Sequence, residues 1–260
     1  MKHHVRGALS LAFLILVLSG CRTIDRVRKN ETLYFVGGFS SWDFEPMRRD
    51  ANNPYRFKMG RMMTWKGDGQ FKFGTKINNW ENQYHPYTAN APFSYTLAIR
   101  DSSENNTWLL HEAESNRAYK MSLDTGVWPM KFVMFPFDAY PAVYISGDAA
   151  GGGAMNPAYA LSPVDNNPYI MSWQGTLRPG TFNFLCEGYS GGEGSGGESP
   201  GDPGPVFQPW KDRLTPDGSE QQVDLSDSGG GRGWLIEKEG VYLVVFDQLQ
   251  EYAQVIRCGD

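Results

Sequence analysis

The sequence predicts an all-β protein with two tandem immunoglobulin-like antiparallel β-sandwich domains after a lipoprotein signal peptide. Aromatic residues make up 14% of the 260-residue chain. Long stretches rich in alanine, leucine and glutamate are missing, and this composition favours strands over helices. Short apolar runs alternate with Gly, Pro, Asn and Asp, as in antiparallel sandwiches. The chain also matches itself when shifted by about 110 to 125 residues, which is the size of a small domain.

Residues 1–20 are the first predicted element, an export signal. A positive head with Lys2 and Arg6 precedes an apolar run from Ala8 to Leu18, which is the layout of a secretory signal. The run has eleven residues, too few for a membrane-spanning helix, which needs about 20. It ends in Leu18-Ser19-Gly20-Cys21, which resembles the lipobox of bacterial lipoproteins. We therefore expect cleavage before Cys21 and acylation of its thiol.

Residues 21–32 are predicted to form the lipid anchor and a short basic tether to the first strand. The acyl chains would hold the protein on the membrane, since each buried methylene contributes about 0.8 kcal/mol. The tether charges are interpreted either as simple solvation or as contacts with anionic headgroups. They are Arg22, Arg26, Arg28 and Lys29.

The mature chain is acidic. The full chain has 24 basic and 29 acidic side chains, and loss of the signal removes Lys2 and Arg6, which leaves a net charge of -7. An acidic protein disfavours phosphate-rich partners, so no nucleic acid is expected. Apart from Cys21 the chain has only Cys186 and Cys258. An exported compartment permits a disulfide between them, but spacing alone leaves their pairing open.

Five ordered pairs of segments define the internal repeat. A repeat of this length is too long for a solenoid unit and fits an independent domain. We expect a first domain at residues 33–138 and a second at 139–260, each with alternate apolar side chains facing its own core. The pairs are residues 33–37 with 143–147, 52–55 with 166–169, 69–73 with 180–184, 108–110 with 234–236, and 118–124 with 241–247.

The second domain contains a glycine-rich insertion at residues 188–204. Its Gly, Ser, Glu, Pro and Asp side chains bury too little apolar area to order the segment, so we expect a loop. The insertion includes a G-x-S-x-G match at Gly188 to Gly192. A hydrolase elbow needs a helix after the serine and a histidine later in the chain. Here a glycine-rich segment follows Ser190, so no helix is expected. No histidine comes after the serine, because the mature chain has only His85 and His111.

No sequence motif supports a metal site or a cofactor. The chain lacks H-E-x-x-H, paired C-x-x-C and EF-hand patterns. We therefore predict a protein that is not an enzyme and holds no cofactor. A glycosidase stays open as an alternative, because it needs only two carboxylates at a set distance.

The repeat resembles the modules of the SusE/SusF family. The residues that carry the resemblance are the opening strand at 33–37, the Phe71-Lys72-Phe73 strand that leads to Trp80, and the closing strand from Tyr119 to Asp124. Members of that family are outer-membrane starch-binding lipoproteins of Bacteroidetes. The resemblance implies non-catalytic glycan binding, by aromatic pairs with a few polar or basic groups, beside a TonB-dependent transporter. It leaves open which glycan is bound and which membrane face carries the protein.

The segment after residue 71 supplies side chains suited to a sugar. An aromatic ring covers the apolar face of a sugar, and long polar side chains reach its hydroxyls. An alternative holds that Trp80 and Tyr87 plug one end of the sandwich. For Trp42 and Trp65 we favour structural packing. The candidate ligand-binding residues of the first domain are Lys72, Lys76, Trp80, Tyr84 and Tyr87.

The second domain departs from this pattern. Asn183 replaces the lysine of the Phe-x-Phe strand, and the glycine-rich insertion displaces the tryptophan segment. Phe207, Trp210 and Lys211 are the candidates for a weaker second site. A rival hypothesis makes the chain a structural or assembly lipoprotein that binds a membrane protein through exposed aromatics, which are equally enriched in protein interfaces.

Overall fold

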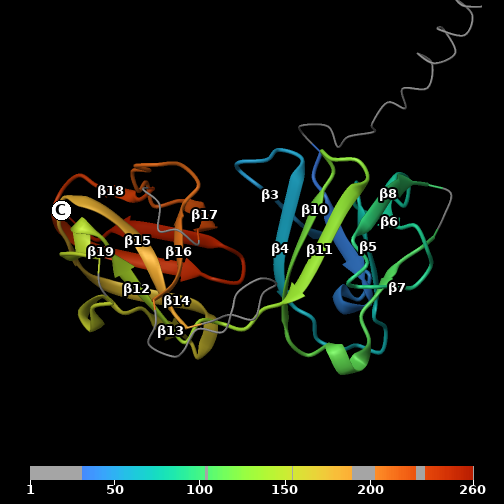
Figure 1. Ribbon diagram of the computed structural model, residues 1–260, viewed down its shortest axis with the longest axis horizontal. Coiled ribbons are helices and arrows are strands. Elements are labelled where there is room, and N and C mark those ends of the chain that lie inside the picture. The colour runs from blue at the N-terminus through green and yellow to red at the C-terminus, as the bar shows by residue number, and fades with distance from the viewer. Residues whose placement is uncertain (1–30, 103–104, 154, 189–202, 227–231, 260) are drawn as a thin grey trace, which may run out of the picture.

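The computed structural model describes residues 31–102, 105–153, 155–188, 203–226 and 232–259 (Figure 1). The predicted signal, the lipidation site Cys21, the basic tether up to residue 30 and almost all of the insertion at 188–204 lie outside the described residues. Within the described part, no helix is long and apolar enough to cross a membrane.

The first domain is one curled sheet. Its strands follow the order β2-β1-β5-β6-β8-β11-β10-β4-β3, and β7 and β9 pair at its margin. Two short 3-10 helices, η1 and η2, join strands. The elements are β1 Tyr34–Gly37, η1 Gly38–Ser40, β2 Glu45–Pro46, β3 Arg48–Arg49, β4 Arg56–Met62, β5 Gln70–Gly74, β6 Gln83–Pro86, β7 Ala91–Pro92, β8 Leu97–Asp101, β9 Trp108–Leu109, η2 Glu112–Glu114, β10 Ala118–Asp124 and β11 Met130–Pro136.

The second domain repeats this architecture. Its order is β12-β15-β16-β17-β20-β19-β14-β13, with β18 paired to β15. Each strand thus occupies the place of one strand of the first domain. The elements are β12 Ala142–Ser146, η3 Asp148–Ala150, η4 Pro157–Tyr159, β13 Ser162–Val164, β14 Asn167–Leu177, β15 Gly180–Glu187, β16 Pro203–Pro209, β17 Glu220–Ser226, β18 Trp234–Ile236, β19 Gly240–Asp247 and β20 Tyr252–Arg257.

The two sheets confirm the predicted all-β class with two antiparallel sandwich-like domains. Each domain has its own hydrophobic core. In the first, Trp108 stacks on Phe71 with ring centroids 5.9 Å apart, and in the second Trp234 stacks on Phe182 at 5.2 Å. The strand registers pair these same residues. The repeat is therefore preserved at the level of individual core contacts. The boundary at residue 138 stays a prediction.

Corresponding tyrosines close the two sandwiches in the same way. The hydroxyl of Tyr119 donates to the carbonyl of Glu114, and the hydroxyl of Tyr242 donates to the carbonyl of Lys238 at 2.8 Å. A tyrosine that bonds backbone a few residues upstream is the tyrosine corner of immunoglobulin-like sandwiches. The bond satisfies a polar atom that would otherwise be buried without a partner.

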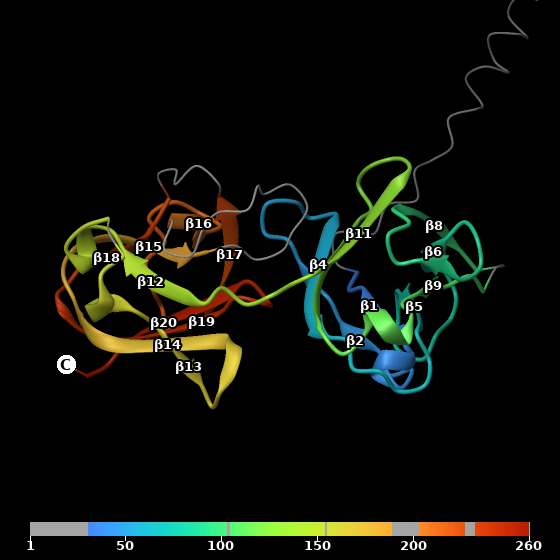
Figure 2. The same cartoon turned by 60° about the horizontal axis from the view of Figure 1, so that its bottom comes forward.

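The two domains contact each other through β3, β4 and β10, which lie on the side of the first domain that faces the second (Figures 1 and 2). The ammonium of Lys120 lies 2.9 Å from Glu251, and that of Lys58 lies 3.3 Å from the same carboxylate. Arg48 adds an ion pair with Glu220 at 3.3 Å. The contact between the domains is therefore rich in paired charge.

Cys186 and Cys258, the two cysteines of the described chain, are both free thiols and do not form a disulfide with each other. Cys186 is fully buried in the second core, and Cys258 is exposed near the end of the chain. Burial raises the pKa of the Cys186 thiol far above its ordinary value. Cys186 therefore behaves as a small core side chain and not as a reactive group.

Candidate ligand-binding surface

The outward face of β1 and β5 forms the base of the candidate surface. Along β5, Phe71 and Phe73 point into the core, so Lys72 and Gly74 belong to the opposite face, as strand alternation requires. Tyr34 of β1 pairs with Gly74. Lys72 and Gly74 thus lie on the same outer face of β5, and the glycine leaves room there for another side chain.

Three aromatic side chains gather over this face. The ring of Trp80 lies 5.1 Å from the Phe44 ring and 6.2 Å from the Trp42 ring, centre to centre. Trp80 is 43% exposed and Trp42 is 36% exposed, whereas Phe44 is half-buried between them and the sheet. The two indoles therefore present a joint apolar surface to solvent, which we call the Trp42–Trp80 surface.

Gly74 makes room for this arrangement. A Cβ atom at residue 74 would lie 2.7 Å from the Phe44 ring, closer than side-chain carbons normally approach. Any other residue would push Phe44, and with it Trp80, away from the strand. The glycine therefore has a packing role at this position.

Trp42 is held in place by an uncommon backbone conformation. Ser41 and Trp42 have φ angles of 56° and 65°, in the left-handed region that bulky residues rarely adopt. The Trp42 amide donates to the Gly37 carbonyl at 2.8 Å, and its indole nitrogen donates to Asp68 at 3.1 Å. Left-handed residues cost of order 1–3 kcal/mol and cluster at ligand-contact sites. The strain points to a role for Trp42 beyond filling space.

Lys72 lies beneath the surface. Its ammonium is 4.7 Å from the centre of the Trp80 ring and donates to the side-chain oxygen of Asn105. Only 3% of the residue is exposed, and burial lowers the pKa of its ammonium. Lys72 thus contributes a cation–π contact that orients Trp80, and its position under the ring contrasts with the direct ligand contact predicted for it.

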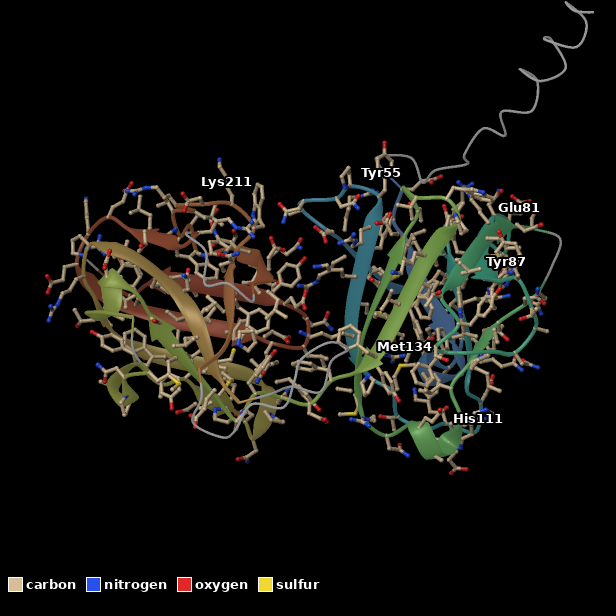
Figure 3. All side chains as sticks on the ribbon, in the orientation of Figure 1. Tyr55, Glu81, Tyr87, His111, Met134 and Lys211 are labelled. Atoms are coloured by element: carbon tan, nitrogen blue, oxygen red, sulfur yellow. The ribbon has the colours of Figure 1, made fainter. Side chains whose placement is uncertain are left out.

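The other first-domain candidates divide into exposed and buried residues. Lys76 and Tyr87 are exposed, and Figure 3 places Tyr87 on the same side of the domain as Glu81, which follows Trp80. Among the described ring contacts none joins Tyr87 to Trp80. Tyr84 is a correction: it is fully buried, because its register with Phe73 turns its ring into the core.

The candidates of the second domain do not assemble into a similar cluster. Phe207 is a correction, since it is fully buried and packs 5.0 Å from Phe246 in the core. Trp210 and Lys211 are at the surface, on the edge of the second domain marked by Lys211 in Figure 3. Trp210 makes no ring contact within the described residues.

The strand registers explain this difference between the domains. Tyr144, Asn183 and Leu185 occupy the places of Tyr34, Lys72 and Gly74. Asn183 has no ammonium to place under a ring. In the second domain, the Leu185 side chain occupies the position that corresponds to the space above Gly74. In the first domain, Phe44 lies in that space. Among the described residues, the matching strands of the second domain therefore carry no counterpart of the Trp42–Trp80 surface, although Tyr159 and Trp173 form a separate, half-buried stacked pair there with ring centres 5.3 Å apart.

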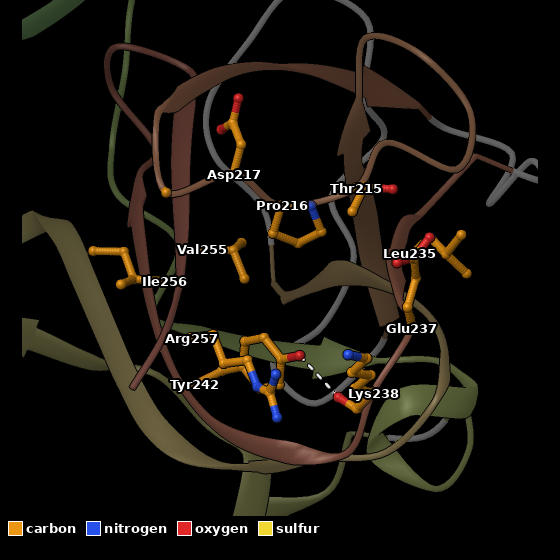
Figure 4. Close-up of a pocket in the computed structure, with 11 residues that line it drawn as sticks. Thr215, Pro216, Asp217, Leu235, Glu237, Lys238, Tyr242, Val255, Ile256 and Arg257 are labelled. Atoms are coloured by element: carbon orange, nitrogen blue, oxygen red, sulfur yellow. Dashed lines mark hydrogen bonds between the residues drawn. The ribbon is translucent and has the colours of Figure 1, made fainter. Parts of the chain in front are cut away.

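The second domain instead has an open hollow of about 460 Å³ (Figure 4). Tyr242 and Val255 form its buried floor, and Asp217 and Lys238 stand at its exposed rim. Figure 4 shows these side chains arranged around the space, with the Tyr242 hydroxyl bonded to the Lys238 carbonyl.

A substitution between the repeats opens this hollow. In the first domain Phe93 packs at 5.6 Å on Tyr119, the counterpart of Tyr242. Counted from the matching parallel bridges, the residue in the place of Phe93 is Pro216. The smaller ring leaves the space over the tyrosine unfilled.

In the described part of the chain, no group of three or more His, Cys, Asp or Glu side chains is placed to hold a metal ion. The described residues thus form a two-domain all-β protein whose first domain carries the exposed Trp42–Trp80 surface.

The solved structure of SusF from Bacteroides thetaiotaomicron is similar to this chain, with a TM-score of 0.36 and 17% sequence identity. The match covers 89% of this chain and 49% of SusF, so this chain spans about half the length of that protein. No protein-family model and no curated protein matches the sequence.

Proposed function

We propose that this chain is a non-catalytic glycan-binding lipoprotein of the bacterial cell envelope, related to the SusE/SusF family in a two-domain form. The observation that carries the proposal is the pair of exposed indoles, Trp42 and Trp80. Their rings offer flat apolar faces to the C–H face of a sugar, while hydroxyls at the sugar rim meet polar side chains.

The surroundings of the two indoles suit a sugar. Asn79 and Lys76 lie on the loop that carries Trp80, and Lys66 donates to Ser41 at 3.2 Å beside Trp42. These amides, hydroxyls and ammonium groups provide donors and acceptors at the border of the apolar rings. A neutral, starch-like oligosaccharide fits such a surface better than a strongly charged ligand does.

The predicted lipid on Cys21 completes the proposal. It would anchor the protein to the outer membrane, where a captured oligosaccharide is passed to a TonB-dependent transporter complex. The surface then serves capture and not bond cleavage.

Affinity electrophoresis in gels that contain purified plant, host and microbial polysaccharides tests the proposal. Trp80→Ala and Trp42→Ala should abolish retardation by the bound glycan. The melting temperature should stay nearly unchanged, because both rings are partly exposed. Trp210→Ala, also 36% exposed, is the matched control and should retain binding.

Two results would contradict the proposal. Retardation by no polysaccharide, with co-purification of a membrane protein, would favour the assembly role. Release of reducing sugar by the wild-type chain would favour a glycosidase.

A further inference from the structure

The turn between β10 and β11 carries an exposed apolar pair. Val127 is 45% exposed and Trp128 is 53% exposed, which makes Trp128 more exposed than Trp42, Trp80 or Trp210. The turn is neither part of the Trp42–Trp80 surface nor of the contact between the domains. Exposed apolar patches are where proteins contact membranes or partners, so this pair is a candidate contact that needs further evidence from its surroundings.

The tip is held firmly. The amide and the hydroxyl of Thr125 both donate to the Tyr55 carbonyl at 2.9 Å. The amide of Gly126 donates to Asp124 at 2.9 Å, and a Cβ at Gly126 would meet the Tyr55 side chain at 2.8 Å. The backbone therefore presents Val127 and Trp128 at a fixed place.

The tip lies at the edge where the described chain begins. Arg49 donates to the carbonyls of Glu31 and Pro54, and Pro54 precedes the Tyr55 that anchors the tip. Figure 1 shows the start of the described chain and the β10–β11 turn at the same end of the first domain. The predicted lipid site is ten residues before Glu31, a reach of at most about 35 Å.

Charged side chains stand close behind the apolar pair. Asp124 pairs in register with Lys131 on one side and Arg56 on the other. Lys131 is exposed, whereas Arg56, whose side chain is 44% exposed, forms an ion pair with Asp124 at 3.2 Å. Tryptophan with nearby cations is the composition of protein segments that lie at the membrane–water interface.

We infer that Val127 and Trp128 dip into the headgroup region of the same membrane that holds the lipid on Cys21, so that the β10–β11 edge of the first domain faces the bilayer. A bilayer is favoured over a protein partner because the tip adjoins the point at which the chain comes from its anchor. The inference rests on the anchor and is independent of the glycan surface.

Fluorescence quenching tests this contact. The full lipidated protein is reconstituted into vesicles of phosphatidylcholine and phosphatidylglycerol, either plain or with acyl chains brominated next to the headgroup. Wild-type emission should fall in the brominated vesicles relative to the plain ones. Trp128→Phe should lose that difference, whereas Trp210→Phe, the control on the second domain, should keep it.

Equal quenching of wild type and Trp128→Phe, or no quenching of the wild type, would overturn the inference. A second variant, Trp128→Ser, is tested for both quenching and glycan retention. If its quenching equals that of the wild type while glycan retention is lost, the tip belongs to the glycan site and the inference is overturned. Mass spectrometry of the peptide with Cys21 reports acylation separately. If Cys21 bears no lipid, a histidine tag in its place and a nickel-chelating lipid hold the chain on the same vesicles for the same measurement.

Discussion

The ammonium of Lys72 lies 4.7 Å from the centre of the Trp80 ring, on the outer face of the first sheet. The indole covers the cation, which also donates a hydrogen bond to Asn105. The ammonium therefore orients the Trp80 ring from the sheet side and is not exposed to solvent. This relationship converts two exposed tryptophans into a preformed surface, and preformed surfaces lose less entropy when a ligand binds.

Lys72→Met should weaken glycan binding while keeping the alkyl part of the side chain. Loss of the cation–π contact should cost about 1 kcal/mol, which is about fivefold in affinity. Isothermal titration calorimetry with the glycan found in the screen measures this change. Lys238→Met, at an exposed lysine of the second domain, is the control and should leave the affinity unchanged. An equal loss in both variants would show that Lys72 acts only through general charge.

Gly74→Ala should reduce glycan binding with the fold intact. The added methyl group would lie 2.7 Å from the Phe44 ring, which displaces Phe44 and tilts Trp80. Gly153→Ala, where a Cβ meets nothing within 4 Å, provides the control. Affinity electrophoresis and thermal melting of both variants separate a lost surface from a lost fold. Full retention by Gly74→Ala would mean that Phe44 does not set the position of Trp80.

Glu251→Gln should destabilise the protein near neutral pH. Burial alone would raise the pKa of Glu251, but the charges of Lys120 and Lys58 outweigh it and hold the pKa below the ordinary 4.5. The Glu251 side chain is 17% exposed, so the loss should lie between the roughly 1 kcal/mol of a surface ion pair and the roughly 3 kcal/mol of a buried one. Urea unfolding at pH 7 measures the loss, with Glu220→Gln, at a more exposed ion pair, as the milder control.

The same carboxylate predicts a pH dependence. Because its folded pKa is depressed, its contribution to stability is present above pH 4.5 and is lost as the pH falls through the folded pKa. Wild type and Glu251→Gln should therefore converge in stability in acid. A difference that stays constant from pH 7 down to pH 3 would contradict the ion-pair account.

The two thiols of the described chain should differ in reactivity. Cys258 is exposed, whereas Cys186 is buried with a raised pKa. Maleimide should therefore label Cys258 in the native protein and reach Cys186 only after denaturation. Cys258→Ser should abolish native labelling. If neither thiol reacts until a reductant is added, the two cysteines are paired.

The strand repeat could be predicted because it rests on local patterns. Phe71 and Phe182 follow turns at matching places, and alternation alone assigns both to a core. Lys72 and Trp80 were also predicted together, because only seven residues separate them. The sequence favours packing for Trp42, because its place on the surface depends on the left-handed backbone at residues 41 and 42 and on the bond to Asp68.

Buried and exposed aromatics could not be separated from the sequence. Tyr84 follows Trp80 by four residues, yet its ring is inside because β6 pairs with β5 in a register that only the folded sheet defines. Phe207 is inside for the same kind of reason, since it pairs with Phe184. The hollow over Tyr242 was missed because its cause, Pro216 in the place of Phe93, is visible only once the parallel bridges align the two repeats.

Because Leu185 stands in the place of Gly74, the second domain lacks an equivalent of the Trp42–Trp80 surface among the described residues, and this limits the number of binding sites per molecule. If the Trp42–Trp80 surface is the glycan site that we propose, each molecule would hold a polysaccharide at one point and release it at the rate of that one contact. Firm retention of a long polymer then arises when several neighbouring copies, confined to the plane of the membrane, engage it together. The density of the protein on the cell would set how tightly the polymer is held.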